Sequence, residues 1–365
     1  MSENYAAAVE ELIWQGSQLE DGPAKVAMLE EAVRLADTHR DVELGFTARN
    51  ELIRAANFSG EPEKSLVAFS WCLAQADRDP EKFAGHNLLW TYKWVSHSLG
   101  TFPQISKQQI AAMLADMARR YQQAGSTLRA VYMKQFQLAR EMGDKAEARH
   151  FYRLWKKTPR DWLSDCHACE VDLEIAYLRG LGKDEEALQT AEPILRGSLR
   201  CAEVPHCTFG QILLPLLRLG RLDEAARYHE RGYRMTSSNP TFLDTVTEHL
   251  EYVILTGNLA KAVKLLEKHL SWALASSQLG KAFAFYRAGL FLIERLQKSG
   301  KETMKLRLPA NFPELAKDGK YELDQLHAWF SRMCRDLAEQ FDRRNENTFF
   351  SRQIRDVRKL HELAK

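Results

Sequence analysis

The 365-residue chain has few of the features that mark membrane, secreted and nucleic-acid-binding proteins. Its 51 basic and 49 acidic residues give a formal net charge of +2, so no strong field attracts nucleic acid or an anionic membrane. No apolar run is long enough to cross a bilayer, and the start, MSEN, does not resemble a secretion signal. Six cysteines at this length are typical of a reducing compartment. We therefore expect a cytoplasmic protein without nucleic-acid or membrane partners.

Catalytic motifs and strand patterns are also scarce. The sequence contains no P-loop, no glycine-rich dinucleotide motif, no zinc-protease motif and no serine-hydrolase elbow. Sustained alternation of apolar and polar residues, which predicts strands, is absent as well. Acidic pairs such as Asp223-Glu224 stand at expected helix starts, where they complement the helix dipole. The sequence predicts an all-α protein that is not an enzyme.

A spaced pair of small residues recurs along the chain: a glycine, and five positions later alanine or serine. It occurs at Gly22/Ala27, Gly60/Ser65, Gly143/Ala148, Gly182/Ala187, Gly220/Ala225 and Gly257/Ala262. Gly100 and Gly300 continue the series, although Ile105 and Lys305 occupy their small-residue positions. Successive glycines are 37 to 43 residues apart. A period of this length is typical of a helical repeat array.

The physical chemistry of one repeat explains the pattern. The glycine ends a first helix in the left-handed conformation, and a short turn leads to a second, antiparallel helix. The small residue of the second helix lies where the two backbones approach closely. One such pair cannot bury its apolar face alone, so neighbouring pairs must stack.

The glycine and small residue resemble those of the tetratricopeptide repeat (TPR). The resemblance covers roughly residues 5–300, but these units are longer than the standard repeat of about 34 residues, and the aromatic signature of the first helix is mostly missing. Pairing of the HEAT type is the structural alternative. The resemblance implies a TPR-like α-solenoid of about seven to eight helix pairs over residues 1–305, from a divergent bacterial member of the family.

The last sixty residues lack the repeat. Residues 306–320 contain two prolines and no helical period, so we expect a loop there. Amphipathic helices are expected over residues 321–341 and 349–363. We interpret residues 306–365 as a loop with C-terminal capping helices that cover the end of the repeat array. A partner-binding tail is the alternative.

The TPR resemblance also implies a concave groove lined by the first helices. Its lining positions lie 10, 6 and 3 residues before each helix-end glycine. Carried onto this sequence, they include Asn50, Arg54, Asn57, Trp90, Trp94, His97, Met133, Gln137, Arg140, Asp172, Arg179, Thr247 and Glu251. The two tryptophans either form an aromatic anchor site or pack between repeats. The arginines favour a partner segment with acidic groups and a large apolar anchor.

Four cysteines and two histidines are concentrated between residues 166 and 207. Cys166 and Cys169 have the spacing of a zinc knuckle, and Cys201 with His206 forms a second pair, for which Cys207 is a possible substitute. Both pairs precede first helices of adjacent repeats, at the same edge of a solenoid. Three interpretations remain open: buried structural thiols, one structural zinc, or a redox-active dithiol.

Three functional hypotheses follow. The first is a non-catalytic scaffold or adaptor that binds a peptide or protein segment in the groove. The second is a peptide- or ligand-responsive regulator that acts through a partner protein. The third is a metal- or redox-linked protein that uses the Cys166–Cys207 cluster.

Overall fold

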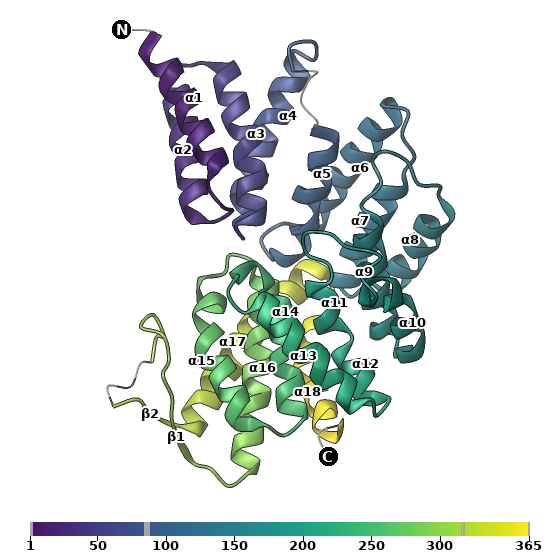
Figure 1. Ribbon diagram of the computed structural model, residues 1–365, viewed down its shortest axis with the longest axis vertical. Helices are drawn as coiled ribbons and strands as arrows, with labels where there is room; N and C mark the ends of the chain where they lie inside the picture. The colour runs from purple at the N-terminus through teal and green to yellow at the C-terminus, as the bar shows by residue number, and fades with distance from the viewer. Residues whose placement is uncertain (1–2, 84–87, 315, 317, 364–365) are drawn as a thin grey trace. The chain divides into compact units, whose positions relative to one another are not determined.

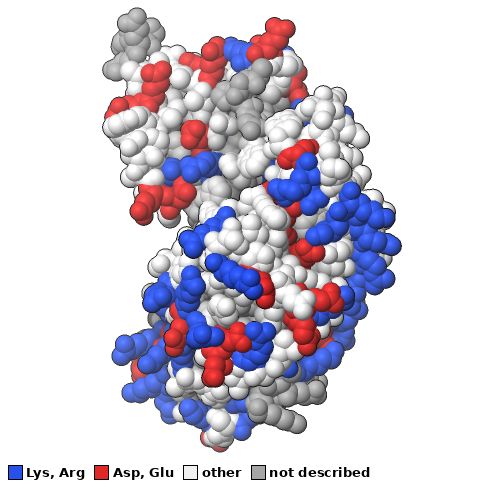
Figure 2. Space-filling view, turned by 45° about the vertical axis from the view of Figure 1, so that its right-hand side comes forward, with Lys and Arg blue, Asp and Glu red and all other residues white. Residues whose placement is uncertain are grey.

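The computed structural model describes residues 3–83, 88–314, 316 and 318–363, and most of them are helical (Figure 1). The expected all-α class is confirmed. None of the described helices is long and apolar enough to cross a membrane. Side chains of both signs, Lys and Arg as well as Asp and Glu, lie on the face drawn in Figure 2, as the small net charge leads one to expect.

The chain divides into two compact units. Unit 1 comprises residues 1–99, 108–135 and 152–163, and unit 2 comprises residues 100–107, 136–151 and 164–365. Four elements run across this division: η1 (Leu99–Thr101), α6 (Lys107–Gln123), whose first residue alone belongs to unit 2, α7 (Arg129–Glu141) and α8 (Lys145–Lys157).

Unit 1 is built from neighbouring helices that pack side by side. The helices are α1 (Glu3–Gln18), α2 (Pro23–Thr38), α3 (Val42–Phe58), α4 (Pro62–Arg78), α5 (Leu88–His97) and α6 (Lys107–Gln123). Small buried residues, among them Ala32, Ala36 and Ala48, let the first helices approach closely. The buried rings of Phe69 and Tyr92 meet edge to face at 4.7 Å and extend this core toward α5.

Unit 2 holds the larger apolar core, which extends from α9 to α18. Its elements are α9 (His167–Gly180), α10 (Asp184–Leu195), α11 (His206–Gln211), α12 (Leu213–Arg218), α13 (Leu222–Thr236), η2 (Pro240–Phe242), α14 (Leu243–Leu255), α15 (Leu259–Ala275), α16 (Leu279–Lys298), β1 (Thr303–Lys305), β2 (Lys320–Glu322), α17 (Leu323–Asn345) and α18 (Phe349–Leu363). The short helices α11 and α12 together occupy the place of one expected first helix.

The glycine pattern marks the helix turns as expected. The backbone is left-handed, with φ between 70° and 81°, at Gly60, Gly143, Gly182, Gly220, Gly257 and Gly300. The small residues that follow are buried, with at most 4% of their surface exposed, at Ser65, Ala148, Ala187, Ala225 and Ala262. The helix ends and the close helix contacts therefore lie where the spacing predicts them.

Three glycines of the series depart from the pattern. Gly22 is extended and precedes α2, and Ala27 is exposed. Gly100 lies within η1, and Gly300 is followed by β1 rather than by a helix. The turn between α2 and α3 uses Arg40, with φ 56°, so a search for glycines does not detect it.

The described residues of 306–319 form the expected loop, but two short strands that were not predicted flank it. β1 and β2 pair antiparallel, with Thr303 opposite Glu322, and close the segment into a hairpin whose residues 315 and 317 lie outside the described residues. Strands of three residues are too short to show an alternating pattern in the sequence. Residues 306–365 belong to unit 2, where Phe350 stacks on Phe341 at 4.2 Å. The division at residue 305 stays a prediction.

Within unit 2, first helices contact first helices. α9 packs on α11, α11 on α14, and α14 on α16, while α18 packs on α14, α16 and α17. At the start of this line, the ring of Phe136 on α7 meets that of Tyr177 on α9 edge to face at 5.0 Å. We call the side chains that α7, α9, α11, α14 and α16 contribute along this line the first-helix row. It positions the polar side chains described next.

Candidate functional site

The expected groove residues fall into both compact units. Asn50, Arg54, Asn57, Trp90, Trp94 and His97 lie on α3 and α5 in unit 1. Gln137, Arg140, Asp172, Arg179 and Glu251 lie on α7, α9 and α14 in unit 2. A single groove that contains both groups stays a prediction.

The two tryptophans have partners inside unit 1. Trp94 is half-buried and meets the ring of Phe58 edge to face at 5.6 Å. The ammonium of Lys93 lies 3.0 Å from the ring centroid of the half-buried Trp90, and it donates to the backbone carbonyl of Leu163 at 2.8 Å. These contacts account for the partial burial of both rings and favour the packing interpretation. Arg54 and His97 are exposed.

Polar side chains connect successive first helices of unit 2. Thr208 Oγ1 and Gln211 Nε2 on α11 donate to the carboxylate of Asp172 on α9, at 2.5 and 2.9 Å. Arg179 on α9 forms an ion pair with Glu248 on α14. Arg287 on α16 pairs in turn with Glu251 on α14, at 2.7 Å. Hydrogen bonds and two ion pairs therefore link the four first helices α9, α11, α14 and α16 along the first-helix row.

A cavity of about 180 Å³ opens beside these ion pairs. Its charged lining is Arg179, Glu248, Glu251, Arg287 and, from α18, Asp356. Its apolar lining comes from α12 and α14, with Leu213, Leu214, Leu217, Tyr252 and Leu255. A concave site with an apolar wall and a few convergent charges is the usual form of a ligand pocket.

Burial changes the acid–base properties of the row. Desolvation raises the pKa of Glu248 to about 7, although the nearby Arg179 opposes the shift. It also raises the pKa of Asp172 to about 6, against the hydrogen bonds from Thr208 and Gln211. On α7, burial lowers the pKa of Arg140. Both carboxyl groups thus gain or lose protons close to neutral pH.

Arg140 differs from the other arginines of the row. Its guanidinium lies 4.0 Å from Glu141, its sequence neighbour. Among the described residues, its buried Nε atom has no hydrogen-bond partner. Gln137, also on α7, is buried and donates to Glu141 at 3.0 Å. Arg140 therefore retains a hydrogen-bond donor for a further acceptor.

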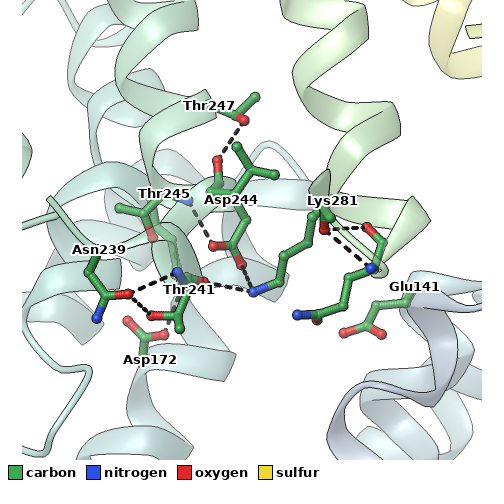
Figure 3. Close-up of polar contacts among 12 residues, drawn as sticks. Glu141, Asp172, Asn239, Thr241, Asp244, Thr245, Thr247 and Lys281 are labelled. Atoms are coloured by element: carbon green, nitrogen blue, oxygen red, sulfur yellow. Dashed lines mark hydrogen bonds and ion pairs between the residues drawn. The ribbon is translucent and has the colours of Figure 1, made fainter. Parts of the chain in front are cut away.

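A lysine on α16 forms a second polar group next to the row (Figure 3). Lys281 Nζ donates to the backbone carbonyl of Thr241 at 2.9 Å and lies 3.7 Å from Asp244. Burial lowers its pKa, but Asp244, Glu203 and Glu141 together raise it above the usual value. Lys281 remains charged and ties the start of α16 to the start of α14.

The family spacing misses several of these residues. Thr247, an expected lining residue, is buried and donates to the carbonyl of Leu243 at 2.7 Å, while its neighbour Glu248 faces the cavity. One residue turns the side chain by about 100° around a helix, so an offset error of one exchanges the two roles. The expected Met133 is also buried. Arg287 and Lys281, both on α16, lie outside the spacing altogether.

Three cysteines converge as the sequence predicts. The Sγ atoms of Cys166, Cys169 and Cys201 all lie within 4.8 Å of one another, and those of Cys166 and Cys169 are 2.9 Å apart. Cys166 caps α9 and accepts from the backbone N–H of Cys169 at 3.3 Å. Hydrogen bonding from Cys169 lowers the pKa of the Cys166 thiol to about 5. This cluster can hold a metal ion.

The other two expected ligands do not join the cluster. The ring of His206 stacks on Phe242, with centroids 5.3 Å apart, and burial lowers its pKa. Cys207 follows His206 in the first turn of α11, and burial raises the pKa of its thiol well above the usual value. Because α11 starts at His206, its first residues point into the packing of α11 against η2 and α14. The cluster of described residues therefore has three sulfur ligands.

A group of buried histidines lies between α13, α14 and α15. The Nδ1 atoms of His229 and His249 are 3.1 Å apart, and Tyr233 Oη lies 2.9 Å from Nε2 of His269. All three histidines are at most 3% exposed. Desolvation lowers the pKa of His229 and of His269 to about 4, and that of His249 well below its usual value. The three rings are therefore neutral at pH 7.

Comparison with known proteins gives no assignment. No family model matches the chain, and no curated protein matches it.

Proposed function

We propose that this chain is a non-catalytic interaction scaffold with a TPR-like solenoid architecture. It holds a peptide or protein segment on the first-helix row of unit 2. One observation carries the proposal: the 180 Å³ cavity lies against two ion pairs, Arg179–Glu248 and Arg287–Glu251. Paired charges keep the wall of a site rigid and hydrated before a ligand arrives, and the ligand then loses less entropy on binding.

The lining indicates the chemistry of the bound segment. Leu213, Leu214 and Leu217 present an apolar wall that suits one large apolar side chain. Arg140 has a buried donor to spare, and an arginine binds a carboxylate more strongly than a neutral acceptor. We therefore expect an extended segment with an apolar anchor and an acidic group a few residues away.

Peptides selected from a random display library against the full chain test this proposal. The selected sequences should share an acidic residue near a large apolar one. Arg140→Ala, and Leu217→Phe at the half-buried cavity wall, should each weaken their affinity by about 2 kcal/mol, roughly thirtyfold.

Lys264→Ala serves as the matched control, because Lys264 is exposed on α15 away from the cavity lining. Its affinity should equal that of the wild type. Equal affinity in all three variants would show that the peptides bind elsewhere, and it would refute binding on the first-helix row.

A ligand-responsive regulator is a second reading of the same site. It is favoured by the position of α18, since Asp356 lines the cavity and Gln353 accepts from Arg287 at 3.4 Å. A segment that enters the cavity would compete with α18 and could pass a signal to a partner protein through the tail. Small-angle scattering with and without a selected peptide separates the two readings, because a scaffold keeps its shape.

We also propose that the three cysteines hold one structural zinc, which the reducing cytoplasm would favour over a disulfide. The support is the mutual approach of the sulfurs of Cys166, Cys169 and Cys201 to within 4.8 Å. Elemental analysis of protein purified without chelator should give about one zinc per chain. The same analysis of Cys169→Ser should give none, because two thiolates hold zinc too weakly to retain it through purification; only added metal at high concentration would occupy such a site.

A further inference from the structure

The geometry points to a metal site with three thiolate ligands and a fourth position open to solvent. This inference rests on the proposed zinc binding and changes its character. We infer that Cys166, Cys169 and Cys201 bind a thiophilic divalent ion such as zinc, and that an exchangeable external ligand completes the coordination. The site would then be an exchange site rather than a closed structural one.

The sulfur positions suit one ion. Zinc binds a thiolate sulfur at about 2.3 Å, so sulfurs on a tetrahedral ion lie about 3.8 Å apart. The sulfurs of Cys166 and Cys169 are closer than this, at 2.9 Å, and none of the three separations exceeds 4.8 Å. Cys166 and Cys169 are held by the first turn of α9, and Cys201 comes from the link between α10 and α11. A small movement of that link brings all three sulfurs to the same ion.

The protein does not supply a fourth ligand in the described residues. A further histidine, cysteine or carboxylate would have to lie within 4.8 Å of all three sulfurs, and neither Asp165 nor His167, which flank Cys166, does so. His206 is held against Phe242 by ring stacking. Cys207 follows it on α11, and its thiol interacts with Thr245 of α14.

Solvent reaches the cluster from one side. Cys201 is exposed, whereas Cys166 and Cys169 are half-buried. Closed zinc sites in proteins have four protein ligands, and sites with three keep a position for water or another ligand. Soft thiolates select zinc and similar ions over magnesium or calcium. The fourth position should therefore accept a small external donor, such as imidazole or a low-molecular-weight thiol.

Cobalt(II) as a spectroscopic probe tests the inference on the full chain. Cobalt bound by thiolates gives charge-transfer absorption whose intensity follows the number of sulfur ligands. Cys201→Ser should lose roughly one third of it, because one thiolate of three is removed. Addition of imidazole to the wild type should shift the visible bands of the ion without releasing it.

Two matched variants decide between an open and a closed site. His206→Ala and Cys207→Ser should leave the cobalt spectrum and the imidazole response unchanged. If His206→Ala instead weakens cobalt binding and imidazole has no effect on the wild type, the site is closed by His206. That result would overturn the open position and leave the zinc proposal standing. If the wild type binds neither zinc nor cobalt, the zinc proposal and the open coordination position are both refuted.

Discussion

Acid should destabilise unit 2 through its buried histidines. The Nδ1 atoms of His229 and His249 lie 3.1 Å apart, so one ring must accept the hydrogen bond of the other and cannot carry a proton there. The pKa values of His229 and His269 fall to about 4 in the folded chain. An unfolded histidine has a pKa of about 6.5.

The sign and size of the effect follow from these values. Because the folded pKa is depressed, the neutral rings contribute their full stability above pH 6.5. That stability is lost as the pH falls from 6.5 toward 4, where the unfolded chain binds protons that the folded chain excludes. At pH 5 the loss is about 2 kcal/mol for each of His229 and His269. Since total stabilities are about 5–15 kcal/mol, the combined effect is large.

Two carboxyl groups act in the opposite direction. The pKa values of Glu248 and Asp172 are raised to about 7 and about 6, so the folded chain takes up their protons more readily than the unfolded chain. Their contribution to stability therefore increases as the pH falls from 7 toward 4.5. A comparison between wild type and a histidine variant removes this term, because both proteins contain it.

The assay is urea unfolding at several pH values between 7 and 5. Hydrogen exchange in α13 to α15 then shows whether the loss of stability is located at the histidines. His269→Gln keeps a polar group near Tyr233 but does not titrate. Its unfolding free energy should fall less steeply with acid, by roughly 1.2 kcal/mol per pH unit near pH 5. His150→Gln, at an exposed histidine of α8, should follow the wild type. Parallel curves for wild type and His269→Gln would refute the reasoning.

Two further predictions concern the helix turns. Gly143→Ala places a methyl group into the ring of Phe349 at a left-handed position, so thermal unfolding should show a loss of more than about 2 kcal/mol. Gly220→Ala, left-handed but without neighbours within 4 Å, should lose only about 1 kcal/mol, and equal losses would contradict the role of Phe349. Ala225→Leu should overpack α13 and cost about 1–3 kcal/mol. Ala27→Leu, at an exposed alanine of α2, should be nearly neutral; if it is as damaging, burial of the small residue is not the cause.

The positions of the helix turns were readable from the sequence because each depends on one local requirement. A left-handed backbone needs glycine at low cost, so Gly143, Gly182, Gly220 and Gly257 mark their helix ends directly. Arg40 meets the same requirement at some strain and leaves no signal. The hairpin of β1 and β2 was missed because pairing across fourteen intervening residues, 306 to 319, is not a local property.

The candidate site was only partly readable. The convergence of Cys166 and Cys201 followed from the repeat, because both precede first helices of adjacent pairs. The sequence did not reveal that His206 lies outside the cluster, because the packing of its ring on Phe242 depends on tertiary structure. Arg179 was predicted to lie on a first helix, and it lies on α9. Its partner Glu248 was missed, since ion pairs between helices depend on rotation angles that a spacing rule fixes only to within a residue.

The most direct test of the proposed scaffold function locates a bound peptide on the chain. A photoreactive copy of the strongest selected peptide would be cross-linked to the full chain, and the attachment points mapped by mass spectrometry. We expect attachment on α12 and α14, at residues that line the cavity such as Leu217 and Tyr252, and its loss in Arg140→Ala. Attachment confined to unit 1, or to the exposed side of α15 around Lys264, would contradict the account.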